Sequence, residues 1–317
     1  MQGLVSFQDR VQPEHVFGKT VHRGATLDEA LAYTGLDSFN ERQVPVYAEG
    51  LEVPNQKAIM IDVDGTTRVA GQHSHRYGLV RHAEAMKFVG LLTSKSDLAV
   101  DVMGYYREGS AAYASLALPE SVSIAGDEVR GYLRVVSSYD GSTPLLFQAH
   151  ATRMRCKNEI SSMLRRKDLP RLSVKHIGDP LGRVGVASAR NALQMTFDAL
   201  DDFSTIADQW ANEEWDAEQL DKVLTTLHPV KKDDSARVVA RQENAQDAII
   251  EALQSETNEG IRRSFWGLLQ ATTEVAQWKQ PNKDERKRAA SALSGGLVKN
   301  ERNAQTIIAE VGELQLV

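Results

Sequence analysis

Hydrophobic and polar residues alternate along much of residues 57–156, which is the spacing expected of half-buried antiparallel strands. Two of these runs, "KAIMIDV" and "TTRVAGQ", flank Asp64 and Gly65, a pair of residues typical of a two-residue hairpin turn. At residues 81–95 the alternation gives way to apolar residues at helical spacing. Strand patterns then resume until Cys156, and residues 157–166 are again helical in spacing. The block is therefore predicted to contain hairpins, a helix, an antiparallel meander and a second helix.

The flanking regions are predicted to be mostly helical. Thr26 and Glu29 occupy the positions of a capping box at the start of "TLDEALAYTGL", which predicts a short helix before the strands. After the strands, apolar residues follow helical spacing almost to Trp278. The fold class is therefore α+β: a meander flanked by helices and followed by a mainly helical region. The expected divisions are an N-terminal arm with a short helix (1–55), an α+β core with a basic sheet face (56–190), a helical region (191–280) and a charged, loosely packed C-terminal arm (281–317).

The composition is that of a globular protein. Hydrophobic residues make up 42% of the 317 residues and charged residues 25%. A single cysteine excludes a disulfide framework and fits a reducing compartment. No apolar run approaches the roughly 18 residues of a membrane span, and no signal peptide is recognisable. A cytoplasmic protein without membrane contact is expected.

Charge is distributed unevenly along the chain, whose net charge is −6. Residues 151–190 hold ten Lys/Arg and three Asp/Glu, a net charge of +7. Residues 191–260 hold sixteen Asp/Glu and five Lys/Arg, a net charge of −11. A basic centre beside an acidic flank is compatible with binding a polyanion, which the overall charge would conceal.

One motif resembles a catalytic one. "AIMIDVDGTT" is similar to the first motif of the haloacid-dehalogenase phosphatases, in which two aspartates, here Asp62 and Asp64, serve as nucleophile and general acid on a magnesium ion. That fold requires a parallel sheet and a later acidic pair, neither of which the sequence indicates. A simple Asp-Gly hairpin is favoured, and a metal-dependent phosphohydrolase remains the less favoured alternative.

Three other possible sites have weaker support. Gly18-Lys19-Thr20 lacks the earlier glycine of a phosphate-binding loop, because Pro13 occupies that position. The histidines of "HSHRYGLVRH" have no acidic or cysteine partner at ligand spacing, so a metal is not favoured. Cys156 could pair with His150 or His176 as a nucleophile, but a lone cysteine is more often a small buried apolar group. No cofactor or metal is expected.

The hairpin "GYLRVVSSYDGSTPLLFQAHATRMRC" (131–156) carries the strongest functional pattern. If Asp140 and Gly141 form a two-residue turn, residues whose numbers sum to 281 lie opposite each other. Arginine and aromatic side chains then share one face of the sheet. Arginines neutralise phosphates and aromatic rings stack on unpaired bases, so this face predicts binding to nucleic acid. The predicted contacts are Arg130, Tyr132, Arg134, Phe147, Arg153 and Arg155, extended by Arg165, Arg166, Lys167, Lys175 and His176. The simpler alternative is that these arginines solubilise an exposed sheet face or pair with acidic residues from 191–260. Asn158 is expected to cap the following helix.

Several motifs in the chain resemble the phage/plasmid-like proteins grouped as domain of unknown function 932. They are the Ser-x-x-Asp-Gly-Ser turn at 137–142, the Arg-x-x-Cys-x-Asn element at 153–158, Tyr77 with its following helix, the Lys175-His176 pair and "FWGLLQATTEVAQW" at 265–278. Lys175 stands where the family is expected to have arginine, which keeps the charge but not the bidentate geometry. The likeness covers most of residues 45–280 and implies membership rather than a function.

The predicted order of helix, meander and helix is also similar to that of the single-strand-annealing recombinases. The analogy implies a phage or plasmid protein that holds single-stranded DNA, or RNA, in a basic groove as a ring or filament of identical subunits. Such a protein needs neither a catalytic residue nor a nucleotide, and it would act in the host cytoplasm. The alternative is a phage structural or host-takeover protein whose basic patch contacts an acidic host surface.

Overall fold

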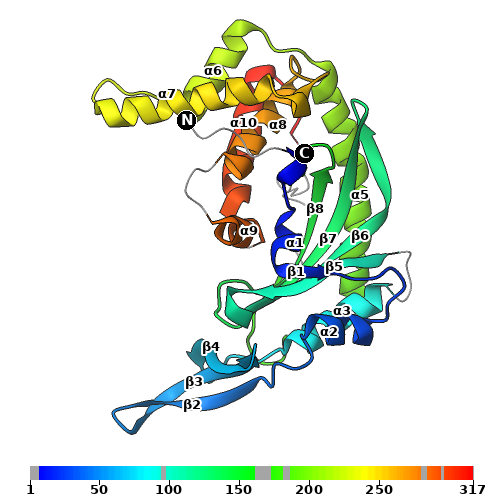
Figure 1. Ribbon diagram of the computed structural model, residues 1–317, viewed down its shortest axis with the longest axis vertical. Helices are drawn as coiled ribbons and strands as arrows, with labels where there is room; N and C mark the ends of the chain where they lie inside the picture. The colour runs from blue at the N-terminus through cyan, green and yellow to red at the C-terminus, as the bar shows by residue number, and fades with distance from the viewer. Residues whose placement is uncertain are drawn as a thin grey trace.

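The computed structural model describes residues 7–93, 98–160, 173–180, 186–279, 284–293 and 296–316. It contains one large and one small antiparallel sheet, together with helices that pack on both faces of the large sheet (Figure 1). Helices dominate the C-terminal part of the chain. The predicted α+β class is confirmed.

The large sheet contains the predicted meander. Its strands follow the order β1-β5-β6-β7-β8-β10, with β9 also paired to β8, and every pairing is antiparallel. Consecutive strands β5 to β8 are neighbours because short connections join them. The strands are β1 (Gly18–Thr20), β5 (Ala99–Tyr106), β6 (Ala111–Ile124), β7 (Asp127–Ser138), β8 (Leu145–Arg153), β9 (Asn158–Ile160) and β10 (Ser173–Val174). The helix predicted at 157–166 is wrong over β9, and the rest of that range lies outside the described residues.

Each face of the large sheet is covered by different helices. On one face, Leu133 belongs to the main hydrophobic core with Met86 of α3 (His82–Thr93) and Phe203 of α5 (Val186–Asn212). On the other, Tyr113 and Val136 belong to a smaller core with Phe17 of α1 (Pro13–Phe17) and Leu293 of α9 (Glu285–Leu293). α3 confirms the helix predicted at 81–95.

The small sheet, β2-β3-β4, projects from one end of the molecule (Figure 1). Its strands are β2 (Arg42–Ala48), β3 (Leu51–Val63) and β4 (Thr66–Ser74). Asp64 and Gly65 both have positive φ, 52° and 72°, as a type I′ two-residue turn requires. The predicted hairpin is confirmed there. The expected division at residue 55 falls inside β3.

The short N-terminal helix forms as predicted. α2 (Leu27–Thr34) begins with a complete capping box between Thr26 and Glu29. Gly35 ends it with a φ of 79°, a left-handed conformation that glycine adopts without strain.

The described part of the C-terminal region is mainly helical as far as Gly312. It comprises α5, α6 (Ala217–Leu227), α7 (Ala236–Leu253), α8 (Phe265–Trp278), α9 and α10 (Gly296–Gly312). The expected division at 190 falls inside α5. The expectation of a loosely packed arm at 281–317 is wrong, because Ile308 and Ala309 of α10 are buried in the main core with α8. Short 3-10 turns lie at Phe7–Asp9, Arg107–Gly109 and Glu256–Asn258.

Candidate functional site

The register of the β7–β8 hairpin differs by one residue from the prediction. Arg130 lies opposite Thr152 and Tyr132 opposite His150, so paired numbers sum to 282. The reason is the connection, in which the Asp140 carboxylate accepts a hydrogen bond from the Ser142 N–H at 2.9 Å instead of forming a two-residue turn. The slip moves Phe147 and Arg153 to the face opposite Arg130, Tyr132 and Arg134, so the predicted basic face does not exist.

Two of the predicted nucleic-acid contacts are fully buried. Arg134 donates to Glu14 and, at 3.1 and 2.8 Å, to Glu159. Arg153 donates to Asp127, with its Nε at 2.9 Å, and to the side-chain oxygen of Asn258 at 3.1 Å. Both guanidinium groups are 0% exposed, so they contact carboxylates rather than a ligand. The prediction that Arg134 and Arg153 contact nucleic acid is therefore wrong.

The other predicted contacts are distributed over several environments. Tyr132 and Phe147 are also buried, at 3% and 4% exposure, and the Tyr132 ring stacks on His150. Arg130 and Arg155 remain partly exposed, whereas Lys175 is exposed and its neighbour His176 is buried. The structure therefore does not bring the set together on one surface. Arg165, Arg166 and Lys167 lie outside the described residues.

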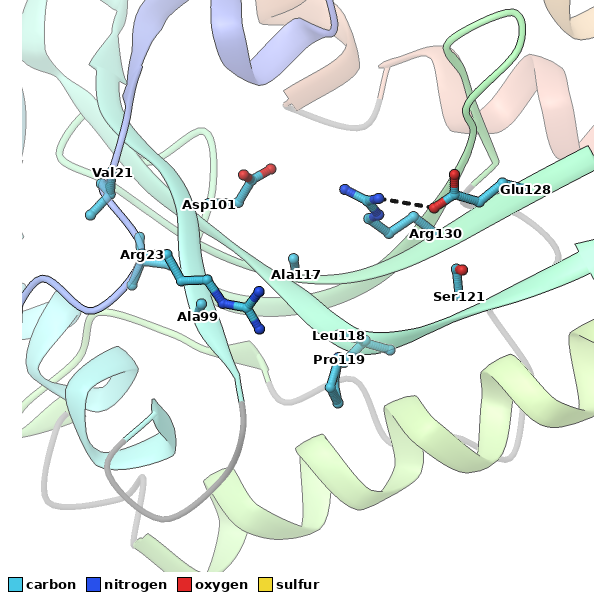
Figure 2. A pocket seen from close by; sticks show the side chains of 11 residues that line it. Val21, Arg23, Ala99, Asp101, Ala117, Leu118, Pro119, Ser121, Glu128 and Arg130 are labelled. Carbon is cyan, nitrogen blue, oxygen red and sulfur yellow. Dashed lines mark hydrogen bonds and ion pairs between the residues drawn. The ribbon is translucent and has the colours of Figure 1, made fainter.

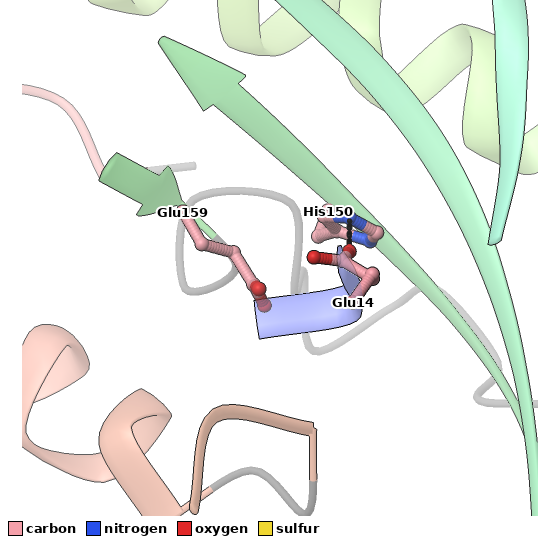
Figure 3. Close-up of side chains that lie close together, drawn as sticks. All are labelled: Glu14, His150 and Glu159. Carbon is pink, nitrogen blue, oxygen red and sulfur yellow. Dashed lines mark ion pairs between the residues drawn. The ribbon is translucent and has the colours of Figure 1, made fainter. Parts of the chain in front are cut away.

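Glu14, His150 and Glu159 form a buried cluster (Figure 3). Their potential ligand atoms lie within 4.8 Å of one another, and His150 Nε2 is 2.8 Å from Glu14 Oε1. Arg134 bonds to both carboxylates, so a guanidinium already supplies the positive charge that a metal ion would bring. Burial raises the pKa of both carboxyls, but the charge and hydrogen bonds of Arg134, together with His150, outweigh it and hold them below their usual value. The cluster is therefore an ion-pair network. No sequence pattern indicates Glu14 as a member of this cluster.

The Arg-x-x-Cys-x-Asn element joins the sheet to α8. The Asn158 side chain donates to the Gln270 carbonyl at 3.2 Å and accepts from the Trp278 indole N–H at 2.9 Å. Cys156 is buried, with its Sγ 3.9 Å from Gln270 Oε1, and burial raises the pKa of its thiol. A raised pKa opposes nucleophilic reactivity. Asn158 lies in β9 and caps no helix there, so that prediction is wrong.

The remaining family-like motifs meet at the loop after β7. The Tyr77 hydroxyl donates to the Ser138 carbonyl at 3.0 Å, and its ring stacks between those of His73 and His176, with centroids at 3.9 and 5.1 Å. A Cβ added to Gly71 would lie 1.9 Å from the Tyr139 carbonyl oxygen, so only glycine permits this approach. These residues hold the loop in place.

The aspartates and histidines with a catalytic appearance are separately satisfied. Asp62 accepts from Thr67 at 2.7 Å and pairs with Arg42, while Asp64 accepts from the Tyr105 hydroxyl at 2.8 Å. The strand that contains Asp62 and precedes Asp64 pairs antiparallel with β4, unlike the parallel strand that the dehalogenase motif requires. His82 is buried with its Nε2 2.9 Å from the Gly109 carbonyl oxygen. In the described parts of the chain, the histidines of "HSHRYGLVRH" take part in no potential metal-binding group.

A β-bulge on β5 turns Asp101 out of the regular pattern. Val100 lies opposite Leu116, whereas Val102 lies opposite the next residue, Ser115, so Asp101 is an extra residue. A bulge bends its strand and redirects the side chain of the extra residue. The Asp101 carbonyl accepts from the Val21 N–H at 2.9 Å, which holds the bulge against the segment after β1.

A second bulge lies on the neighbouring strand β6. Residues 118–120 face a single residue of β7, Gly131. Pro119 has no N–H to donate to the strand ladder, which favours an irregularity at this position. A Cβ on Gly131 would lie 2.7 Å from Leu118 and 2.8 Å from Leu200, so the glycine leaves room for both side chains. A proline on one strand and a glycine on the next therefore favour the bulge.

The two bulges border a pocket of about 280 Å³, here called the double-bulge pocket. Figure 2 shows that its lining comes from the segment after β1 and from strands β5, β6 and β7. Its polar side chains are Arg23, Asp101, Ser121, Glu128 and Arg130. Arg130 is the one residue of the predicted contact set that lines it.

Charges in the double-bulge pocket are balanced, but they are not all paired. Arg130 donates to Glu128 at 2.9 Å, and that carboxylate raises the pKa of Arg130. The Arg23 guanidinium and the Asp101 carboxylate make no hydrogen bond or ion pair with any described residue. The pocket therefore offers both a cation and an acceptor to a ligand, and among the sites in the described residues it is the best candidate.

Sequence comparison places this fold in a family. A model of the family described as "Domain of unknown function (DUF932)" matches residues 69–294. The chain belongs to this family. No curated protein and no solved structure matches the chain.

The DUF932 match contains both bulges and all the motifs that tie the sheet to α8. Glu14 and Arg23 lie before it. The expected family membership is thus confirmed, whereas the family's description assigns no chemistry to the pocket. No helix in the described ranges is both long and apolar enough to span a membrane.

Proposed function

We propose that this DUF932 protein binds single-stranded nucleic acid and works in strand annealing as a homo-oligomer in the host cytoplasm. The double-bulge pocket, rather than the sheet face predicted from the sequence, is the contact surface. The observation that carries the proposal is the exposed Arg23 guanidinium, which lines the pocket together with Arg130 and makes no ion pair with any described residue.

The chemistry of the pocket supports this function. Guanidinium groups bind phosphate oxygens through charge-assisted hydrogen bonds, and Arg23 has its donors available. Arg130 has one carboxylate partner, and its side chain is 39% exposed, so it can contact a second anion. A pocket this small accommodates one unit of a flexible strand more readily than the width of a duplex.

The arrangement of elements supports it by analogy. α3 and the meander β5 to β8 follow one another in the order expected from the annealing recombinases, and α5 follows after the short strands β9 and β10. Fold order alone is weak support for a function, so the pocket carries the proposal and the order accompanies it.

Self-association is supported by apolar residues on the small sheet. Tyr47, Leu51 and Val69 are 61%, 76% and 60% exposed, respectively. These side chains lie on all three strands and are spread along the length of the sheet, so they offer apolar surface for a protein–protein contact rather than one compact patch. We therefore expect this sheet to contact a neighbouring subunit.

The test is a fluorescence-anisotropy titration with single- and double-stranded oligonucleotides at several salt concentrations, with sizing of the same sample. We expect tighter binding to single strands by an oligomer. Arg23→Ala and Arg130→Ala should each weaken binding about tenfold and lower the slope of log affinity against log salt by about one. Arg81→Ala is the matched control, because Arg81 is an exposed arginine paired with one nearby carboxylate, that of Glu84.

Two results would contradict the proposal, one for the contact surface and one for the function. Normal binding by both pocket variants would refute the pocket as the contact surface. Absence of binding even at low salt would refute the function and favour the host-interaction alternative, in which a protein partner contacts this surface.

A further inference from the structure

Asp101 has an environment that needs explanation. It is half-buried at the bulge of β5, and its carboxylate has no partner among the described residues. Burial and the nearby Asp101 carboxylate raise the pKa of Tyr132 to about 12, so the negative charge acts close to the sheet surface. A carboxylate accepts hydrogen bonds and donates none when ionised, and partial burial makes an unmet acceptor costly. The site therefore favours a ligand that brings an N–H donor.

The size of the pocket limits that ligand. At about 280 Å³ it lies just below the roughly 300–1,000 Å³ of pockets for drug-sized molecules. Arg23 supplies donors for an anionic group, while Asp101 supplies the acceptor. One nucleotide, with a phosphate and a base that carries an amino group, has both complements.

We infer that the double-bulge pocket holds one base of the strand and prefers cytosine to thymine, with Asp101 accepting a hydrogen bond from the cytosine amino group. The inference rests on the proposed function and names what the same pocket recognises. Cytosine carries an N4 amino donor where thymine carries the O4 acceptor. A carboxylate bonds to the first and repels the second, so the discrimination follows from the acceptor alone.

The experiment compares oligo(dC) and oligo(dT) of equal length on the full chain by anisotropy. We expect oligo(dC) to bind about tenfold more tightly, in the range of one good base contact. In Asp101→Asn the preference should fall to near equality, because the amide can donate to thymine O4 as well as accept from cytosine N4. The control is Glu120→Gln, which removes an exposed carboxylate from the β6 bulge without touching the pocket lining, and it should keep the preference.

The outcomes separate this inference from the function beneath it. Equal affinity of the wild-type protein for the two oligonucleotides overturns the inference and leaves single-strand binding intact. A preference that persists in Asp101→Asn, or that disappears equally in Glu120→Gln, overturns the role of Asp101. Absence of binding to either oligonucleotide overturns the proposed function and the inference with it.

Discussion

Arg130 and Arg134 lie four residues apart on the same face of β7, and their environments are opposite. Arg134 is 0% exposed and bonds to the carboxylates of Glu14 and Glu159. Arg130 is 39% exposed, bonds to Glu128 alone and lines a pocket. The same residue type on the same strand face is thus a structural ion pair at one position and a possible ligand contact at the other.

The covering segments account for this difference. α1 lies over the sheet at Arg134, and an arginine buried there must have carboxylates beside it, because an unpaired buried charge is strongly destabilising. At Arg130 the two bulges interrupt the regular strands, and the guanidinium reaches solvent. Strand alternation alone therefore does not identify a ligand surface. The segment packed over the sheet face determines whether a side chain on it is buried or can contact a ligand.

The largest expected effect is on the buried arginine. Arg134→Ala should lower the free energy of unfolding by about 3–5 kcal/mol, since it leaves the Glu14 and Glu159 carboxylates buried without their cation. Urea denaturation measures it. Arg130→Ala, from the exposed member of the comparison, should change stability by less than about 1 kcal/mol. Equal losses in the two variants would contradict the contrast drawn here.

Local signals predicted much of the fold. The Thr26–Glu29 capping box, the Asp64-Gly65 hairpin and the helix that became α3 each depend on a few neighbouring residues. Their geometry is decided within one or two turns of chain, where residue preferences act directly. The meander followed from the same short-range patterns.

The candidate site depended on longer-range features. Glu14 reaches Arg134 across 120 residues of sequence, and no pattern around either residue indicates the partner. The predicted β7–β8 register is wrong by one residue, because the Asp140 carboxylate accepts hydrogen bonds from Ser142 and Arg107 and the connection is not a two-residue turn. Pro119 and Gly131 inside predicted strands were signs of a bulge, and Pro119 lines the pocket.

Acid should lower the stability that the buried Glu14–Arg134 ion pair contributes, which is the second largest effect. Arg134 holds the pKa of Glu14 below its usual 4.5 in the folded protein, so the unfolded chain takes up a proton first as the pH falls. The stabilisation is complete above pH 4.5 and is lost below it, by about 2–3 kcal/mol for one strongly paired carboxyl. Glu14→Gln should be less stable than wild type at neutral pH, and urea titrations should show the two converging on acidification. A difference independent of pH would contradict the ion-pair assignment.

The link between the sheet and α8 can be tested with a pair of tryptophans. Trp278→Phe removes the indole N–H that bonds to Asn158 and leaves a buried oxygen without that donor, which should lower stability by about 1–2 kcal/mol beyond the change in packing. Trp266→Phe is the control, because Trp266 is fully buried in the same helix and its indole N–H has no partner among the described residues. Thermal unfolding of both variants measures the difference, and identical values would show that the Asn158 bond contributes nothing.

Replacing Arg155 should have the smallest effect on stability. Arg155 is exposed only two residues after the buried Arg153, so the two arginines can be compared directly. Arg155 is 38% exposed and stands 3.7 Å from both Asp127 and Glu259, where solvent screens the attraction. Arg155→Ala should therefore change the free energy of unfolding by less than about 1 kcal/mol, as denaturant titrations would show, and should leave single-strand affinity unchanged because the residue does not line the pocket. A loss of stability like that of Arg134→Ala would mean that exposure does not separate the two kinds of arginine. Weakened binding would instead extend the contact surface along the hairpin to Arg155, which the sequence pattern predicts as a nucleic-acid contact.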